Sequence, residues 1–250
     1  MDTAAVVHAQ SGSPRTHRGR VRTVLSGIGQ LLLTVGIVLL LFVAYELWWT
    51  GLTTKHDQSV LRTQLHRQWA QHISIKDPPL GSGIAILRIP RFGKNYLFVI
   101  VQGTSTDDLI KGPGHYPGTA MPGHIGNFAV AGHRTTYLHP FYNINELKVG
   151  DPIVIETRTT WFTYRVENIP GTNAKYQEIV SPYDSPVAYP VPDQPDPNLA
   201  PTQRVLTFTS CNPRYSAAQR IVVHALLVNR TLKAPGVLPP ALLHEYAHQT

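Results

Sequence analysis

Polar and apolar residues divide the first 80 positions of the chain into three segments. Residues 1–22 are polar and contain four arginines, residues 23–49 are almost continuously apolar, and residues 50–80 are polar again. The apolar segment exceeds the roughly 20 helical residues that cross a hydrocarbon core of about 30 Å. We therefore expect a tail at 1–22, a transmembrane helix at 23–49 and a juxtamembrane stalk at 50–80. A helix packed on the following domain is the alternative for the stalk.

The residues that flank the apolar segment predict its orientation. Arginines precede it and Trp48-Trp49 close it, which fits a cytoplasmic N-terminus with an aromatic belt at the outer interface. A cleaved signal peptide is the alternative, but the segment is long and no A-x-A-like site follows it. We expect a single-pass membrane protein whose main domain is extracellular.

The pattern changes after Gly81 to short β-branched or aromatic runs separated by Gly, Pro, Asn and Asp. This alternation is typical of an all-β barrel or sandwich. We expect strands at 84–89, 96–101, 127–131, 152–157, 161–167, 204–209 and 219–228, and short helical turns at 106–111 and 141–147. The proline-rich connection at 168–203 is long enough to be functional, so we expect it to contact substrate. Residues 233–250 are expected to form a tail.

The charge of the chain supports this topology more than it suggests a polyanionic partner. The net charge is +7, and the first 22 residues carry +3 of it through four arginines and one aspartate. The remaining Lys and Arg residues are scattered and do not alternate with stacking aromatics. This distribution argues against nucleic-acid binding.

Cys211 is the single cysteine of the chain and cannot form an intramolecular disulfide. On the oxidising outside of a cell, reactivity is then a better explanation for it than structure. Arg220 begins the next expected strand, and adjacent antiparallel strands bring their near ends into side-chain reach. His133 follows the 127–131 strand, and a distant His is a candidate base for a Cys nucleophile. Taken alone, each residue also has an ordinary structural explanation as a buried thiol, a surface histidine or a solvated arginine.

Several motifs together resemble those of the sortase family. The run Thr207-Phe208-Thr209-Ser210-Cys211 resembles the sortase signature Thr-Leu-x-Thr-Cys, with Phe for Leu and Ser for Thr. Arg220 lies at the distance where sortases carry their essential arginine, and Ala131-Gly132-His133-Arg134 resembles the segment around the sortase histidine. The resemblance covers residues 81 to about 230. It implies a closed eight-stranded β-barrel with short helices at 81–232, preceded by one transmembrane helix.

The resemblance also implies an activity and roles for individual residues. Sortases cleave a C-terminal sorting signal, typically Leu-Pro-x-Thr-Gly, between Thr and Gly and join the Thr carbonyl to an amine of a cell-wall precursor or pilin. Cys211 would form the thioester, His133 would transfer protons and Arg220 would stabilise the oxyanion. Ser210, Thr209 and Tyr137 are the expected substrate contacts.

The pattern from His133 to Tyr137, together with Cys211-Asn212-Pro213, is most similar to class E sortases of high-GC Gram-positive bacteria. Class E enzymes favour Leu-Ala-x-Thr-Gly, and class D is the nearest competitor. Some class A sortases bind calcium through acidic residues that we cannot place in this chain. We therefore expect no metal and no cofactor.

A second motif competes with the sortase interpretation. His244-Glu245-Tyr246-Ala247-His248 matches H-E-x-x-H, the signature of zinc metalloproteases. No third ligand follows it in the sequence, and Pro239-Pro240 leaves room for only a short helix, so we expect at most incidental metal binding there. Two further alternatives remain open, a thioester hydrolase of the same fold and an anchored cell-wall-binding β-domain without chemistry.

Overall fold

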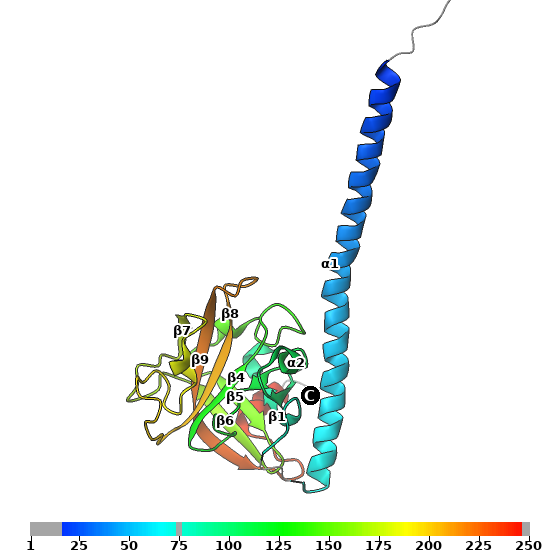
Figure 1. Cartoon of the computed structure of the whole chain (residues 1–250). Helices are drawn as coiled ribbons and strands as arrows, with labels where there is room; N and C mark the ends of the chain where they lie inside the picture. Colours follow the sequence, from blue (N-terminus) through cyan, green and yellow to red (C-terminus); the bar gives the residue numbers. More distant parts are fainter. Residues whose placement is uncertain (1–16, 74–76, 247–250) are drawn as a thin grey trace, which may run out of the picture. The chain divides into compact units, whose positions relative to one another are not determined.

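The computed structural model describes residues 17–73 and 77–246 and divides the chain into two compact units, Met1–Leu47 and Trp48–Thr250. One long helix, α1 (His17–Ala70), contributes to both units (Figure 1). In the first unit, Arg22–Tyr45 is the one described segment that is long and apolar enough to cross a membrane, and its side chains are exposed. The expected apolar helix is therefore present.

In the second unit, α1 packs against the domain that follows it. Thr54, Leu61 and Leu65 recur at helical spacing and are buried, and the two leucines contact Val99 and neighbouring apolar residues of the sheet. Gln58 donates to the carbonyl oxygen of Val99 at 3.0 Å and accepts from the amide of Val99 at 2.7 Å. The expectation of a free stalk at 50–80 is therefore wrong for this segment, and the packed-helix alternative holds, because an apolar stripe on α1 is buried on the sheet.

The described residues of the second unit contain nine strands and several short helices. The strands are β1 (Gly83–Arg88), β2 (Phe98–Gln102), β3 (Gly114–His115), β4 (Gly126–Ala131), β5 (Pro152–Glu156), β6 (Thr160–Val166), β7 (Gln177–Val180), β8 (Arg204–Asn212) and β9 (Gln219–Leu232). The helices after α1 are η1 (Pro90–Phe92), α2 (Thr106–Leu109), η2 (Ile144–Glu146), η3 (Ser185–Ala188) and α3 (Pro240–Tyr246). All seven expected strands and both expected helical turns are present, with shifted ends.

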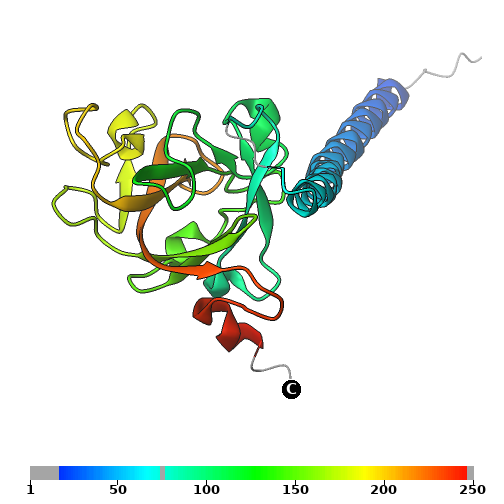
Figure 2. The same cartoon turned by 90° about the horizontal axis from the view of Figure 1, so that it is seen from below.

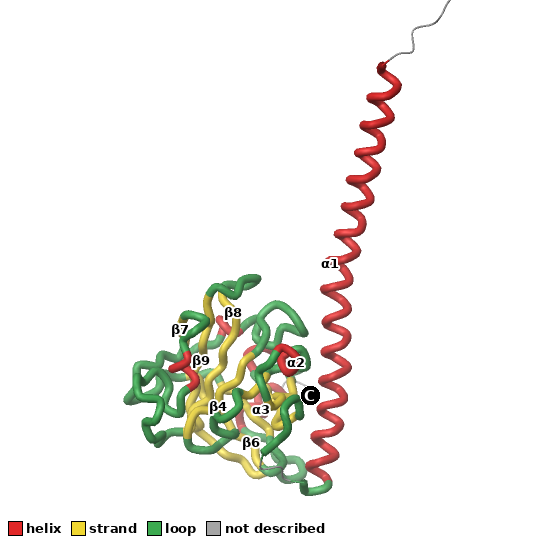
Figure 3. Tube along the Cα trace, in the orientation of Figure 1, coloured by secondary structure: helices red, strands yellow, loops and turns green. Residues whose placement is uncertain are grey.

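The strands close into a barrel. Their order is β6-β5-β1-β2-β3-β4-β8-β9, and β9 returns to pair with β6, so eight of the described strands form a closed ring (Figures 1 and 3). The remaining strand, β7, pairs with the first half of β9, and the second half of β9 pairs with β6. The expected eight-stranded barrel is confirmed. The sequence pattern missed β3 and β7.

Alternation along the strands separates an apolar interior from an outer face. In β4 the interior residues are Phe128 and Val130, and in β8 they are Leu206 and Phe208, all part of one buried cluster. Asn127, Thr207, Thr209 and other intervening residues therefore project from the outside of the barrel. Long loops gather on the β7 side of this outer face (Figure 3).

The segment after β9 is partly folded on the barrel. Leu242 of α3 is 1% exposed and packs with Val154 of β5 and Trp161 of β6. Figure 2 shows α3, in red, beside the end of the barrel. The expected tail therefore includes a short helix whose apolar side chain is removed from water.

Candidate active site

Cys211 lies near the end of β8 and faces Arg220 near the start of β9. Their Cα atoms are register partners in the antiparallel β8–β9 pair. Directly opposed residues of such a pair project from the same face of a sheet. The register therefore brings the backbone positions of Cys211 and Arg220 side by side, as expected for the near ends of two adjacent strands.

His133 reaches the same place through a parallel pairing that the sequence did not predict. β4 runs parallel to β8 with Ala129 opposite Thr207 and Ala131 opposite Thr209. Two residues beyond the Ala131–Thr209 pair, this register brings His133 to the level of Cys211, on the outer face. Gly132 extends the ladder by donating to the carbonyl oxygen of Thr209 at 3.1 Å. The three expected catalytic residues therefore converge on one end of the outer face.

The imidazole of His133 is largely shielded from water. Its Nε2 atom is buried and has no hydrogen-bond partner among the described residues, and the ring of Tyr137 lies 4.9 Å away between centroids, tilted by 43°. Burial lowers the pKa of His133 below the ordinary histidine value. The side chain is consequently neutral at pH 7. Tyr137, an expected substrate contact, lies against the ring of His133, the expected base.

Arg220 is held at the turn between β8 and β9. Its Nη1 donates to the carbonyl oxygens of Ala217 and Gln219, at 3.0 Å each. Both acceptors are backbone groups of the turn, so this cation is positioned by the hairpin that also carries Cys211.

Sequence reasoning missed Arg134, the residue after the histidine. Arg134 is 6% exposed, and its Nη1 donates to the carbonyl oxygen of Cys211 at 3.1 Å and to Oδ1 of Asn212 at 2.7 Å. Its Nη2 donates to Oδ1 of Asn145 at 3.0 Å. Burial and the nearby charge of Arg214 lower the pKa of Arg134, whereas attraction to the Cys211 thiolate raises it. The guanidinium thus ties the histidine loop to the cysteine strand.

A second arginine extends this network towards solvent. Arg214 stacks over the ring of Tyr142 at 4.1 Å and hydrogen-bonds to Oδ1 of Asn143 and of Asn145. Two guanidinium groups therefore share Asn145 beside the cysteine strand. Their positive charge would stabilise an oxyanion formed from a substrate carbonyl.

The other two expected substrate contacts have internal partners. Ser210 is buried on the interior side of β8, opposite to Cys211 in the alternation, and donates to the carbonyl oxygen of Gly132 at 2.8 Å. Thr209 lies on the outer face and its hydroxyl pairs with the Tyr116 hydroxyl at 2.8 Å. Their contact with substrate stays a prediction. The structure gives Ser210 a structural role, because its hydroxyl fastens β8 to the end of β4.

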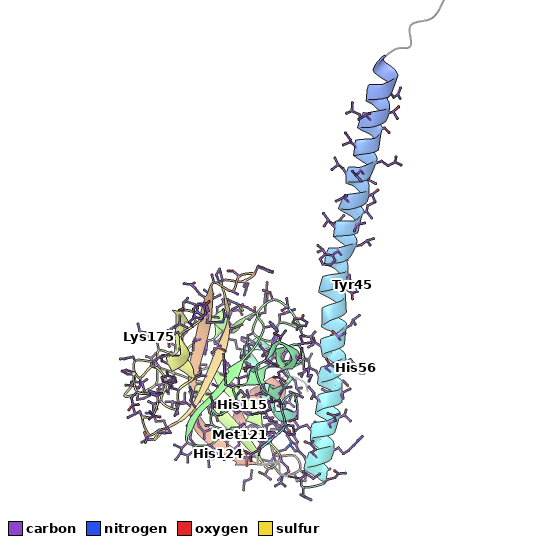
Figure 4. All side chains as sticks on the ribbon, in the orientation of Figure 1. Tyr45, His56, His115, Met121, His124 and Lys175 are labelled. Carbon is purple, nitrogen blue, oxygen red and sulfur yellow. The ribbon has the colours of Figure 1, made fainter. Side chains whose placement is uncertain are left out.

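Two other histidine sites lie apart from Cys211, at His115 and in the H-E-x-x-H motif. His115 is buried beside the barrel, where its ring nitrogens meet Gln102 Oε1, Ala120 O and Thr119 Oγ1 (Figure 4). In the H-E-x-x-H motif, His244 and Glu245 fall within α3, whereas His248 lies outside the described residues.

Comparison with known proteins agrees with this geometry. Residues 87–228 match the model of the sortase domain family. The chain is 34% identical to sortase SrtE1 of Streptomyces coelicolor, over 86% of this chain and 60% of that protein. It is 32% identical to sortase SrtE2 of the same organism, over 92% of each.

A solved structure of sortase E1 from Streptomyces coelicolor, with a tripeptide in its active site, superposes with a TM-score of 0.55 at 34% identity. The superposition covers 65% of this chain and 97% of that one. The chain spans about three fifths of the full length of SrtE1 and nearly all of SrtE2. With its closed barrel and its match to the family model, this chain belongs to the sortase family of cysteine transpeptidases and is similar to the class E sortases.

Proposed function

We propose that the chain is a membrane-anchored sortase that cleaves a Leu-Ala-x-Thr-Gly or Leu-Pro-x-Thr-Gly sorting signal between Thr and Gly and transfers the protein to a cell-wall amine. The observation that carries the proposal is the common register of β4, β8 and β9. It brings His133, Cys211 and Arg220 to one end of one face. The likeness to sortase E1, whose active site holds a tripeptide, supports a peptide substrate.

The chemistry follows from the groups at this site. The Cys211 thiolate attacks the Thr carbonyl carbon, and Arg220 stabilises the oxyanion of the tetrahedral intermediate. His133, as imidazolium, protonates the leaving glycine amine, and the thioester remains. The incoming amine then attacks the thioester while neutral His133 accepts its proton, and the thiolate leaves.

Charge state limits this reaction. Free cysteine and histidine side chains are mostly neutral at pH 7, whereas the first step requires thiolate and imidazolium together. Burial of His133 disfavours the imidazolium further. Only a minor fraction of the enzyme would therefore carry the reactive pair of charges, which predicts a bell-shaped dependence of rate on pH.

A model peptide with glycine amide as acceptor tests the proposal. Mass spectrometry should find the Thr–glycine amide product with wild-type protein and none with Cys211→Ala. Product formation by Cys211→Ala would overturn the assignment of the nucleophile. A free Thr carboxylate as the sole product would identify a thioester hydrolase. No reaction and no labelling of Cys211 by a vinyl sulfone would leave an anchored binding domain.

Two substitutions refine the assignment. Exchanging Ala for Pro in the peptide should lower turnover if the chain shares class E specificity, and equal turnover would favour a class D-like preference. Replacing His244 with Gln should leave transpeptidation unchanged. Loss of peptide cleavage in this variant would instead support a metalloprotease.

The helix at Arg22–Tyr45 would anchor the enzyme beside its substrates, on the extracellular side of the cell membrane. Arginines at 15–22 support a cytoplasmic N-terminus. Trypsin applied to intact cells should then remove the catalytic domain and spare residues 1–22, and the reverse pattern would contradict this topology.

A further inference from the structure

Three side chains that the proposed reaction does not use converge on the outer face of the barrel. His224 projects from β9, Glu178 from β7 and Asp193 from the loop between β7 and β8, and their ligand atoms lie within 4.8 Å of one another. Nε2 of His224 is 3.1 Å from Oε1 of Glu178 and 3.7 Å from Oδ2 of Asp193. The imidazole is completely buried, and the carboxylate side chains are 21% and 15% exposed.

The hydrogen bonds behind His224 determine which of its nitrogens carries the proton. The amide nitrogen of Asn127 donates to the carbonyl oxygens of Val187 and Tyr189, at 3.0 Å each, so Oδ1 of Asn127 must accept. Thr207 supplies the only hydroxyl hydrogen in this bridge and donates it to Asn127 Oδ1 at 2.7 Å. Thr207 Oγ1 therefore accepts from Nδ1–H of His224 at 2.8 Å. The neutral ring consequently points the lone pair of Nε2 at the two carboxylates.

This arrangement brings acceptors together without a donor between them. Oδ2 of Asp193 is buried and has no hydrogen-bond partner among the described residues. A lone pair and two carboxylates that face one another at a shielded position are stabilised by a positive charge between them.

We propose that Glu178, Asp193 and His224 form a site for a single divalent cation of the zinc type. A tetrahedral ion with bonds of about 2.0–2.1 Å sets its ligand atoms about 3.3 Å apart, and the observed separations of 3.1 and 3.7 Å bracket that value. Imidazole suits zinc and its transition-metal neighbours, whereas calcium and magnesium prefer oxygen ligands alone. Thr207 and Asn127 behind His224 fix the ring and its tautomer, as hydrogen-bond partners of metal-bound histidines commonly do.

Such a site would fasten the loop of residues 181–203 to the catalytic face. Its ligands come from β7, β9 and that loop, and Asn127 of β4 already binds two loop carbonyls. Thr207, the neighbour of His224, precedes Cys211 by four residues, or roughly 13 Å along the strand. The ion would therefore position the loop and take no part in bond cleavage. This proposal replaces the expectation of a metal-free protein.

Calorimetric titration with ZnCl₂ tests the site in the full chain, purified in detergent and stripped with chelator. His244→Gln and His248→Gln are included in every sample to remove the tail motif as a competing ligand. We expect one high-affinity zinc ion per chain and a higher Tm with zinc. The absence of such an ion would overturn the proposal.

Variants separate this site from other surface ligands. Asp193→Asn keeps the side-chain shape, and we expect it to weaken zinc binding at least tenfold, as we do for Glu178→Gln. The control His124→Gln replaces an exposed histidine elsewhere on the domain (Figure 4) and should bind zinc unchanged. Unaltered zinc affinity in both carboxylate variants would refute the assignment. This test does not require the His224→Gln variant to fold. These readouts require no transpeptidase activity, so they stand apart from the proposed function.

Discussion

Arg134 allows the sharpest test of how the histidine loop and the cysteine strand are held together. Replacing it with Met retains most of the apolar stem but removes the guanidinium that binds Cys211 O, Asn212 Oδ1 and Asn145 Oδ1. Asn145 is exposed, so water can replace the third bond. The first two oxygens lose a charged donor at a buried position, which costs about 1.5 kcal/mol each.

The substitution also relieves an unfavourable contribution. Burial and Arg214 both lower the pKa of Arg134, so its charge is held at some cost. That relief is smaller than the loss, because the backbone oxygen of Cys211 and the amide oxygen of Asn212 remain in place without their donor. We expect a net destabilisation of about 2–3 kcal/mol, which corresponds to a fall in Tm of roughly 4–12 °C for a domain of this size.

Scanning calorimetry and peptide transpeptidation measure the two consequences. The rate should fall by about 100-fold at a temperature where the variant is folded, because displacement of the thiol by about 1 Å has effects of that order. Arg134→Lys should lie between Met and wild type, since an ammonium cannot span the same oxygens. The control Arg165→Met changes an exposed arginine of β6 and should alter neither quantity. Wild-type Tm and rate in Arg134→Met would refute the reasoning.

Three further predictions concern α1 and the catalytic groups. Gln58→Met leaves the amide and carbonyl groups of Val99 without their partner and should lower the free energy of unfolding by about 2–4 kcal/mol, measured by calorimetry. Gln58→Glu keeps the acceptor and should lower it less. Equal losses of stability in the two variants would contradict this account. Because burial lowers the pKa of His133, the unfolded chain binds more protons than the folded protein just below pH 6.5, so this residue makes the free energy of unfolding rise with pH in that range. In the pH profile of the transpeptidation rate, the acid limb should lie below pH 6.5, and Tyr137→Ala should move it to higher pH. A shift to lower pH would show that Tyr137 does not shield the ring. Arg220→Lys should lower kcat/KM about 100-fold without changing Tm, and full activity would exclude a need for the guanidinium fork.

The sequence predicted the barrel strands because their side chains alternate, and it failed where alternation is too short or absent. β3 consists of Gly114–His115 alone, and β7 lies within a proline-rich connection. The packed part of α1 presents only Leu61 and Leu65 as large buried apolar groups, between polar residues that bind the backbone of the sheet. The sequence alone does not identify this buried face of α1, because the backbone groups that Gln58 binds belong to β2.

The candidate active site could likewise be predicted from the sequence only where its residues lie close together along the chain. Cys211 and Arg220 belong to one hairpin, so their spacing in sequence predicted that they would lie opposite each other on adjacent strands. His133 depends on the parallel β4–β8 pairing, which joins segments about 78 positions apart, so the sequence offered it as a candidate base but could not predict its position beside Cys211. Arg134 was missed because a buried arginine has no local pattern, and its acceptors lie near residue 211.

The polar residues of β8 explain why the cysteine sits where it does. Thr207, Thr209 and Cys211 form one row on the outer face, and the two threonines are buried under other elements. Buried hydroxyls require partners, and these are His224 and Asn127 for Thr207 and Tyr116 for Thr209. Cys211, the next position of the row, is only partly buried, so the thiol is presented where the covering ends. The Thr-x-Thr-x-Cys spacing thus places two anchored hydroxyls and a partly exposed thiol on one face of β8, which is the face that the proposed reaction would use.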